Sequence, residues 1–251
     1  MPFYFISVFN EGSLELGRNH IQSLKNAGIE NYIAYVTDRE SYDVLKSENS
    51  NVVIVEDANV SNEKKDFGTD NFNTMSYLRY KIIYDHLKKG DDVWYLDTDT
   101  VVLHNLNKEY AAIKAKNTMA SVESVDVYFQ NDINMICTGC MLFFSNPKTA
   151  NVAKFIYDNQ NANENDQNLF MNLLQQNPEI LSVKTLNTNN YPNGLVYFDD
   201  EFVSTPAMYK SIKNVFKNYR NKSVYFVHAN WMVGNEKKKQ ALTKNGLWFL
   251  K

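Results

Sequence analysis

Two aspartates in the middle of the chain, Asp97 and Asp99, have the spacing of a divalent-metal site. They follow the apolar run at residues 93–96, which predicts a buried strand, so both carboxylates come where the chain leaves a sheet. Hard oxygen ligands suit Mg²⁺ or Mn²⁺, and such an ion keeps coordination positions for substrate phosphates. Because ligands of open α/β sheets gather at the carboxyl ends of strands, the pattern favours a metal site over a solvated turn.

A histidine and a basic segment near the end of the chain could complete this site. His228 ends the apolar run at residues 224–227, and its imidazole is either a third metal ligand or a structural side chain. Gly234, Lys237 and Lys238 follow it, and a flexible backbone with basic side chains suits a diphosphate. The alternative for this segment is a run of solvated lysines.

Two pairs of polar residues lie on predicted helices. Arg79 and Lys81 are two apart on a predicted helix at residues 74–87, so they do not share a face. One of the two charges would then point toward a phosphate or carboxylate and the other toward solvent. Asp166 and Gln167 stand where another predicted helix begins. Asp166 is either the N-cap residue of that helix or a hydrogen-bond acceptor for a sugar hydroxyl, with the Gln167 amide beside the reacting carbon.

The two cysteines, Cys137 and Cys140, have the C-x-x-C spacing of redox and zinc motifs. They lie in an apolar, strand-like run at residues 136–144, where a free thiol behaves as a small hydrophobic side chain, and the sequence has no second pair to complete a zinc site. We therefore interpret them as core residues of a protein in a reducing, cytosol-like compartment.

Strand and helix patterns alternate around these residues in the first half of the chain. The predicted strands are residues 3–9, 32–36, 52–55 and 93–96, and the predicted helices are 13–27, 39–47 and 74–87, with a polar loop at 56–73. This alternation is typical of βαβ units and of a largely parallel sheet. The second half is less regular, with predicted strands at 119–122, 140–144 and 224–227 and predicted helices at 149–159, 167–176 and 236–244. The sequence predicts one α/β domain over residues 1–251, with two functional halves at about 1–105 and about 106–251.

Composition narrows the function classes. Of the 251 residues, 44% are hydrophobic and 14% aromatic, which excludes a wholly disordered chain. The formal net charge of −3 provides no basic field for nucleic acid or for an anionic membrane. No apolar run approaches the roughly 20 residues that span a bilayer, and the N-terminal apolar run is too short for a signal peptide. We expect a soluble, cytoplasmic protein without a membrane span.

Taken in order, the motifs resemble those of GT-A glycosyltransferases. The similarity is to the retaining group that includes glycogenin and the bacterial lipopolysaccharide galactosyltransferases, and to the related nucleotide-diphospho-sugar transferase family of plant xylosyltransferases. It rests on Arg79-x-Lys81 and on the runs at residues 95–99, 138–143 and 166–168, and it ends with His228, Gly234 and Lys237. The resemblance implies a GT-A (Rossmann-like) fold with a mostly parallel central sheet flanked by helices. It also implies that residues at about 1–105 form a nucleotide-binding half and those at about 106–251 an acceptor and sugar half with a C-terminal diphosphate-binding tail.

The resemblance also implies roles for individual residues. Asp97, Asp99 and His228 would bind Mn²⁺ (or Mg²⁺), and Asp166 and Gln167 match the pair beside the anomeric carbon. The residues that would contact the UDP-sugar donor are Val8, Phe9, Asn10, Thr37, Asp38, Arg79, Thr98, Thr138, Gly139, Gly234 and Lys237. The C-terminal tail departs from the galactosyltransferase pattern, because Gly234 lies six residues after His228 and no Pro-Trp follows Lys237.

The implied reaction moves a sugar of the xylose, galactose or glucose class from a UDP-sugar to a hydroxyl of a glycan or glycoprotein, with retention of configuration. Two alternatives stay open. One is a phosphatase of the haloacid-dehalogenase type, with Asp97 as nucleophile, Asp99 as acid and Asp199 and Asp200 as metal ligands. Its motif normally follows the first strand of the core, whereas three predicted strands precede Asp97. The other is a nucleotide-sugar-binding protein that has lost catalysis.

Overall fold

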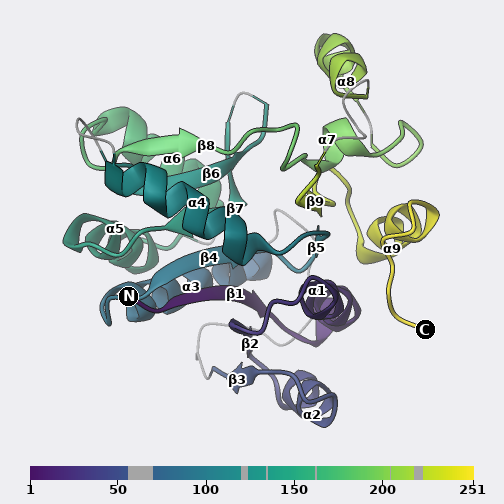
Figure 1. Ribbon diagram of the computed structural model, residues 1–251, viewed down its shortest axis with the longest axis horizontal. Helices are drawn as coiled ribbons and strands as arrows, with labels where there is room; N and C mark the ends of the chain where they lie inside the picture. The colour runs from purple at the N-terminus through teal and green to yellow at the C-terminus, as the bar shows by residue number, and fades with distance from the viewer. Residues whose placement is uncertain (56–69, 120–123, 134, 162, 204, 218–222) are drawn as a thin grey trace.

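The computed structural model describes residues 1–55, 70–119, 124–133, 135–161, 163–203, 205–217 and 223–251. Their central sheet has seven strands in the order β3-β2-β1-β4-β7-β6-β8 (Figure 1). The strands are β1 (Phe3–Phe9), β2 (Tyr32–Val36), β3 (Val52–Ile54), β4 (Asp92–Leu96), β6 (Val127–Asn131), β7 (Ile136–Phe143) and β8 (Val183–Thr185). Strands β3, β2, β1 and β4 are parallel, β7 is antiparallel to both of its neighbours, and β6 and β8 are parallel to each other. The predicted α/β class with a mostly parallel sheet is confirmed.

Helices cover both faces of this sheet (Figure 1). One face packs against α1 (Leu14–Asn26), α2 (Arg39–Ser47) and α4 (Leu106–Met119), and the other against α3 (Asp70–Leu87), α5 (Pro147–Asp158) and α6 (Asp166–Gln176). The alternation of side chains along β4 explains the two cores, because successive residues of a strand point to opposite faces. Trp94 and Leu96 enter the core under α1, whereas Val93 and Tyr95 enter the core under α3.

A second, two-stranded sheet lies beside the first. Its strands β5 (Thr100–Val102) and β9 (Phe226–His228) are antiparallel, and Thr100 pairs with His228. A third core joins this sheet to the C-terminal elements through Val101, Leu195 and Val227. Those elements are α7 (Gly194–Tyr197) and α9 (Asn235–Lys244), and α8 (Lys210–Lys217) packs against α7. Short 3₁₀ turns lie at Glu11–Ser13, after β1, and at Ala207–Tyr209, before α8. The pairing brings the last strand of the chain against the segment that follows β4.

Strand β7 bulges where it passes β4 and β6. The β6–β7 register passes from the pair Phe129–Met141 to the pair Gln130–Cys137, so residues 138–140 are extra on β7. Bulges re-aim side chains beside functional sites. Here the carbonyl of Gly139 accepts a hydrogen bond from the Asp97 amide at 2.8 Å. A Cβ atom at Gly139 would lie 2.5 Å from Asp97 Oδ2 and 2.6 Å from His228 Cε1, so a larger residue there would displace the side chains of Asp97 and His228.

The structure also corrects several predicted boundaries. Helix α3 begins at Asp70, inside the predicted polar loop 56–73, and the last predicted strand is observed at Phe226–His228. The strand predicted at 119–122 is wrong at residue 119, which ends α4, and its other residues lie outside the described part of the chain. Strand β6 was not predicted, because the polar residues Gln130 and Asn131 interrupt its apolar pattern.

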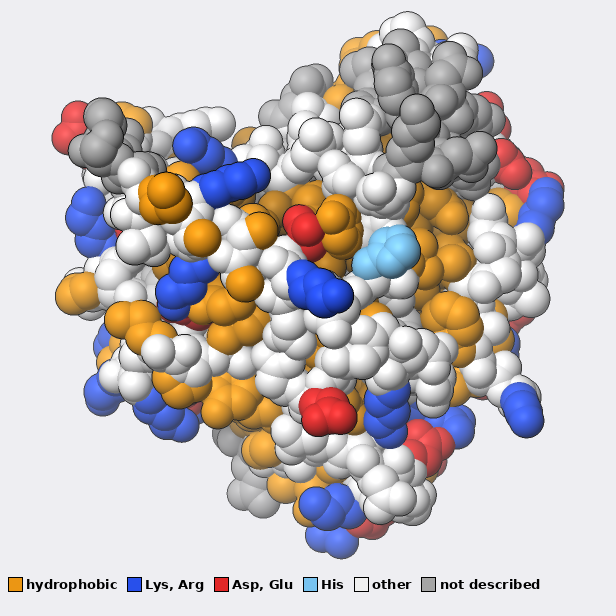
Figure 2. All heavy atoms as spheres, in the orientation of Figure 1, with side chains coloured by type: hydrophobic (Ala, Val, Ile, Leu, Met, Phe, Trp, Pro, Cys, Tyr) orange, Lys and Arg blue, Asp and Glu red, His pale blue; other side chains and the backbone are white. Residues whose placement is uncertain are grey.

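The charged side chains on the surface show no strongly basic face in the view of Figure 2. On the face shown in Figure 2, basic and acidic side chains are interspersed rather than gathered in one patch. None of the described helices combines the length and the apolar character needed to cross a bilayer.

Candidate active site

A cavity of about 550 Å³ opens at one edge of the central sheet. The carboxyl ends of β1 and β4 meet there with the amino end of β7, because β7 runs in the opposite direction. Its wall is lined by residues 8–10 at the end of β1, 97–99 after β4 and 137–139 of β7. The sheet topology therefore brings together three segments that are far apart in the sequence, and the cavity lies at the carboxyl edge of the parallel strands, where ligands of α/β sheets bind.

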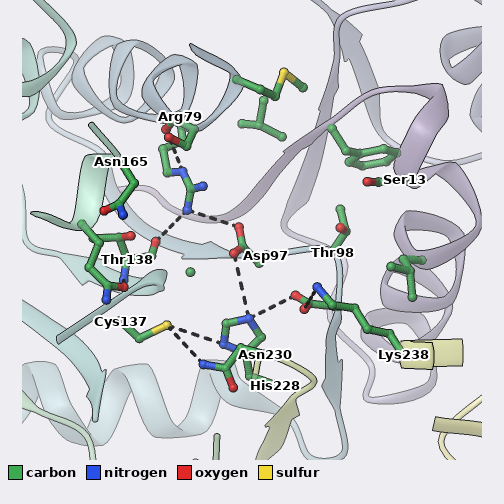
Figure 3. Close-up of a pocket in the computed structure, with 18 of the residues that line it drawn as sticks. Ser13, Arg79, Asp97, Thr98, Cys137, Thr138, Asn165, His228, Asn230 and Lys238 are labelled. Carbon is green, nitrogen blue, oxygen red and sulfur yellow. Dashed lines mark hydrogen bonds and ion pairs between the residues drawn. The ribbon is translucent and has the colours of Figure 1, made fainter. Parts of the chain in front are cut away.

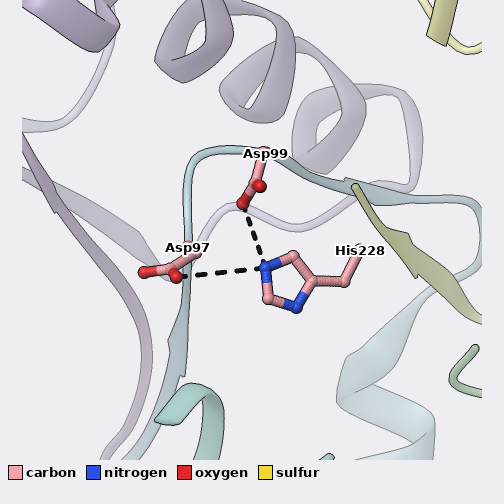
Figure 4. A group of neighbouring side chains, drawn as sticks. All are labelled: Asp97, Asp99 and His228. Atoms are coloured by element: carbon pink, nitrogen blue, oxygen red, sulfur yellow. Dashed lines mark ion pairs between the residues drawn. The ribbon is translucent and has the colours of Figure 1, made fainter. Parts of the chain in front are cut away.

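Asp97, Asp99 and His228 converge in this cavity. Figure 4 shows both carboxylates directed at the Nε2 atom of one imidazole, which lies 3.0 Å from Asp99 Oδ1 and 3.9 Å from Asp97 Oδ2. One ligand atom from each residue lies within 4.8 Å of the others. Asp99 and His228 are buried, while 30% of the Asp97 side chain is exposed. Two carboxylates and an imidazole at this separation fit a divalent cation.

Strong local charges act on these ligands. Burial raises the pKa of Asp99, but Lys238 and His228 outweigh it and hold that pKa far below its usual range. Burial lowers the pKa of His228, and the neighbouring Asp99 carboxylate reverses this and raises it. The site therefore keeps Asp99 ionised and able to act as a metal ligand.

Gln130, which the sequence analysis missed, holds the other side of the histidine ring. Its side chain is fully buried, and its amide nitrogen donates to the carbonyls of Tyr191 at 3.1 Å and Pro192 at 3.0 Å. These two bonds fix the amide so that Oε1 accepts from His228 Nδ1 at 2.7 Å. When the ring proton is on Nδ1, the Nε2 atom keeps a free lone pair on the side of the carboxylates. A histidine that binds a metal through Nε2 needs this tautomer. In the sequence Gln130 is the first of three polar residues after the apolar run 127–129, and nothing in this local pattern indicated that it contacts His228.

Arg79 occupies the upper wall of the cavity in Figure 3. Its guanidinium donates to the Thr138 carbonyl at 2.9 Å and to Asp97 Oδ1 at 3.3 Å, and its Nε lies 3.8 Å from Asp166 Oδ2. Burial lowers the pKa of Arg79, but Asp166 and Asp97 outweigh it and raise that pKa well above its usual value. Lys81, in contrast, pairs with Asp85 on the exposed side of α3. The two charges of this helix have separate roles, as their spacing predicted.

The start of α6 lies against the same wall. Asn165 is the N-cap residue, since its side chain accepts from the Asn168 amide at 2.8 Å, so the N-cap alternative for Asp166 is wrong. Asp166 is buried and accepts from the Tyr80 hydroxyl at 3.0 Å. The Gln167 side chain accepts from the Thr138 amide at 3.3 Å. Both predicted catalytic residues line the cavity.

The C-terminal tail contributes a different lysine from the predicted one. Helix α9 begins after Gly234, which lines the cavity with a φ of 87°, a conformation that glycine adopts without strain. Lys238 also lines the cavity, and its Nζ lies 2.7 Å from Asp99 Oδ2. Lys237 is not part of the cavity wall. Successive helical residues point in different directions, so only one of the two lysines can face the site.

Of the other residues predicted to contact the donor, six line the cavity and two do not. Those that line the cavity are Val8, Phe9, Asn10, Thr98, Thr138 and Gly139. Thr37 and Asp38 lie outside its wall. Asp38 caps α2, accepting from the Ser41 amide at 2.7 Å, and it also accepts from the Glu11 amide at 2.8 Å. Asp38 therefore joins the turn after β1 to the start of α2.

Three further residues that the sequence analysis did not single out for the site line the same cavity. Asp132, Asn230 and Trp231 line the cavity, and Asp132 Oδ1 accepts from Trp231 Nε1 at 2.6 Å. The Asn230 amide donates weakly to Cys137 Sγ at 3.8 Å (Figure 3). Cys137 and Cys140 are free, buried thiols, and burial raises the pKa of both, that of Cys140 to about 12. They act as core and wall residues, as interpreted from the sequence.

The phosphatase alternative required a second acidic pair beside Asp97. Neither Asp199 nor Asp200 lines the cavity, and Asp200 instead forms an ion pair with Lys213 at 2.6 Å. The two acidic pairs therefore do not form one site.

The sequence profile of the nucleotide-diphospho-sugar transferase family matches residues 27–242. The chain is 22% identical, over 289 aligned positions, to a UDP-galactose:fucoside alpha-3-galactosyltransferase of Dictyostelium discoideum. That alignment covers 96% of this chain and 42% of the relative, so the chain spans about two fifths of the relative's length.

Several solved structures share the fold. The glycosyltransferase GlyE of Streptococcus pneumoniae superposes with a TM-score of 0.58 at 12% identity, over 100% of this chain and 61% of GlyE. The galactosyltransferase LgtC gives 0.55 at 11% identity, over 97% and 93% of the two chains. Mouse xyloside xylosyltransferase 1 gives 0.53 at 13% identity, over 92% and 98%. At these identities the likeness shows a common fold.

Proposed function

The chain belongs to the nucleotide-diphospho-sugar transferase family and is a glycosyltransferase of the GT-A fold. From this premise, we propose that it transfers a sugar of the galactose, glucose or xylose class from a UDP-sugar to a glycan or glycoprotein hydroxyl. UDP-galactose is the first donor to test, because the relative from Dictyostelium discoideum is named as a UDP-galactose-dependent enzyme. The xylose and glucose classes remain in the proposal as alternative donors.

The observation that carries the proposal is the convergence of Asp97, Asp99 and His228 in a cavity that Lys238 also lines. A divalent cation held by the first three residues, Mn²⁺ or Mg²⁺, would supply Lewis-acid stabilisation of the diphosphate leaving group. Lys238 and the amino end of α9, which begins after Gly234, add positive charge on the same side. Groups that meet the charge developing on the leaving diphosphate lower the barrier more than they strengthen ground-state binding.

The sheet order supports an orientation for the donor. We place the uridine against residues 8–10 at the end of β1, with Thr37 and Asp38 as its more distant neighbours. The sugar then lies toward Thr138 and Gly139 of β7 and the start of α6, where Asp166 and Gln167 stand beside the anomeric carbon. Arg79 holds Asp97 and Asp166 in place from the α3 side.

Retention of configuration completes the proposal. In the transfer, the bond between the anomeric carbon and the diphosphate oxygen breaks, and its electron pair leaves with UDP. The acceptor hydroxyl oxygen bonds to the anomeric carbon on the face from which UDP departs, and its proton passes to a phosphate oxygen of UDP. The amide of Gln167 and the paired carboxylate of Asp166 orient the sugar during this exchange.

Release of UDP tests the proposal directly. UDP-galactose, UDP-glucose and UDP-xylose would each be incubated with the protein, with methyl glycosides as acceptors and with Mn²⁺ or EDTA, and UDP would be quantified. We expect Mn²⁺-dependent release from one donor, and at least a ~100-fold lower rate for Asp97→Asn, corresponding to about 3 kcal/mol. Asp85→Asn, an exposed carboxylate on α3, is the matched control and should match the unsubstituted protein. A protein that binds UDP and Mn²⁺ but turns over no donor would instead be a nucleotide-sugar-binding protein.

A further inference from the structure

Asp132 is a buried carboxylate with only one oxygen in use. It follows β6, lines the cavity and is 8% exposed. Three donors converge on its Oδ1: Trp231 Nε1 at 2.6 Å, Asn193 Nδ2 at 3.1 Å and Asn230 Nδ2 at 3.3 Å. Among the described residues, none donates a hydrogen bond to Oδ2, and this oxygen is not closed off from solvent. A role limited to holding the three neighbours would need Oδ1 alone.

Because Oδ2 of Asp132 still meets solvent and accepts from no described residue, it is available as a hydrogen-bond acceptor for a group that enters the cavity. A ligand that donates a hydrogen bond can replace the water at this oxygen. A hydroxyl fits this requirement, whereas a phosphate or carboxylate would be repelled by the charge of Asp132. The chemistry of this position therefore selects a neutral, hydroxylated ligand.

The order of the strands separates this position from the proposed nucleotide position. Strand β1 lies on one side of β4, and β7 and β6 lie on the other. Residues 8–10 and Asp132 consequently approach Asp97 from opposite sides. If the uridine lies at the end of β1 and the donor sugar at Thr138 and Gln167, the space beside Asp132 is left for the second substrate.

Apolar side chains flank the same position. Trp231 lines the cavity with its indole nitrogen bound to Asp132, and its φ of 62° is rare for a bulky residue. Met135 and Val233 also line the cavity and are 39% and 69% exposed. A sugar ring has an apolar face of C–H groups as well as hydroxyls, and aromatic surfaces beside a polar group suit that combination.

We propose that Asp132 and Trp231 form the acceptor subsite and that it takes a neutral sugar, with Asp132 Oδ2 accepting a hydrogen bond from an acceptor hydroxyl and Trp231 packing against the ring. This inference rests on the proposed function. The subsite excludes phosphorylated and carboxylated acceptors through the charge of Asp132.

The test uses methyl glycosides of galactose, glucose, xylose and fucose as neutral probes and methyl glucuronide as the anionic probe. UDP release would be measured for the full chain with Mn²⁺ and the active UDP-sugar, with and without each probe. We expect at least one neutral probe to accelerate UDP release and methyl glucuronide to have no effect. Asp132→Asn should raise the KM for that neutral probe at least tenfold, while UDP affinity in Mn²⁺, measured by calorimetry, stays within twofold.

Matched variants separate binding from folding. Asp126→Asn alters another buried carboxylate, which lies just before β6 at the end away from Asp132 and binds Ser182 and Asn146, and it should leave the probe KM unchanged. Trp231→Ala should raise the probe KM more than Trp231→Phe, which keeps an aromatic ring. Trp248→Phe alters a tryptophan that is not part of the cavity wall and should have no effect on the KM.

The two proposals fail in different ways. Absence of UDP release from every donor, with and without probes, would contradict the proposed function and the acceptor subsite with it. UDP release from the donor that no neutral probe accelerates, or an Asp132→Asn variant with an unchanged probe KM, would overturn the acceptor subsite alone. Acceleration by methyl glucuronide equal to that by the neutral probes would overturn its selectivity.

Discussion

At the scale of single residues, the candidate metal site depends on a side chain that would not touch the metal. Gln130 accepts from Nδ1 of His228 at 2.7 Å, and its own amide is held by two backbone carbonyls. Removing this acceptor frees the imidazole to rotate and to place its proton on either nitrogen. We therefore expect the loss of Gln130 to weaken metal binding by His228.

We therefore predict that Gln130→Leu weakens Mn²⁺ binding in the presence of UDP by about 10- to 100-fold. Calorimetric titration of Mn²⁺ into the UDP-saturated protein measures this directly. Gln22→Leu, on the exposed surface of α1, is the control for the change of side-chain type. A Gln130→Leu protein that melts as a folded domain and binds Mn²⁺ as tightly as the unsubstituted chain would show that Gln130 does not position His228.

At the scale of elements, consecutive residues at the start of α6 have different roles. Asn165 caps the helix, while Asp166 and Gln167 line the cavity. Gln167→Ala should lower turnover strongly with little change in UDP-sugar affinity, because a group felt in the transition state acts on kcat. Asp166→Ala should instead weaken recognition of the donor sugar and leave UDP affinity nearly unchanged.

Asn165→Ala is the reference variant for this prediction, and it should lower the free energy of unfolding by about 1 kcal/mol. Steady-state kinetics, UDP affinity and urea denaturation of the three variants give the comparison. Unchanged turnover in Gln167→Ala would remove it from the catalytic residues.

Helix α9 offers a matched pair of lysines one residue apart. Lys238 lines the cavity and pairs with Asp99, whereas Lys237 is not part of the wall. Lys238→Met should weaken UDP binding in Mn²⁺ about tenfold, and Lys237→Met should change it less than twofold, because Lys237 is not in the cavity wall and the contribution of a charge that remains in contact with solvent is small. Calorimetry with UDP and with uridine would show whether the loss lies in the diphosphate. The opposite ranking would restore the role that the sequence pattern assigned to Lys237.

At the scale of the whole molecule, a buried histidine makes stability depend on pH. His20 of α1 donates from Nδ1 to the Thr100 carbonyl at 2.7 Å, and its Nε2 lies 3.0 Å from the Ser7 hydroxyl. Burial lowers the pKa of His20 from 6.5 to about 4. The hydrogen bond to Thr100 and the charges of Asp99 and Asp97 raise this pKa, but they do not outweigh burial. The charge of His228 lowers it slightly further.

The sign of the pH dependence follows from proton binding in the two states. Below pH 6.5 the unfolded chain takes up a proton on His20, while the folded protein does so only below about 4. The free energy of unfolding is therefore unaffected by this group above pH 6.5 and falls by about 3 kcal/mol between pH 6.5 and 4. Urea denaturation across this range should give a smaller slope for His20→Gln than for the unsubstituted chain. Equal slopes would contradict the assignment.

The sequence alone determined the parallel half of the sheet and the place of the metal motif within it. Strands β1 to β4 follow from apolar runs that alternate with helical periodicity, and Asp97 and Asp99 follow directly from the end of β4. Arg79 and the start of α6 were singled out by residue type and helix position, and the family resemblance suggested their roles. These features could be predicted because periodicity, capping and strand ends depend on neighbouring residues in the chain.

Only the tertiary structure decided how the site is completed. Strand β9 pairs with β5, which brings His228 to Asp99 across more than a hundred residues of sequence, and the bulge in β7 brings Gly139 against Asp97. The selection of Lys238 over its neighbour and the position of Asp132 beside the cavity depend on the same packing. Such contacts arise from which segments pair and which faces they bury, and local side-chain patterns do not encode the partners of a segment, since one apolar strand can pair with many others.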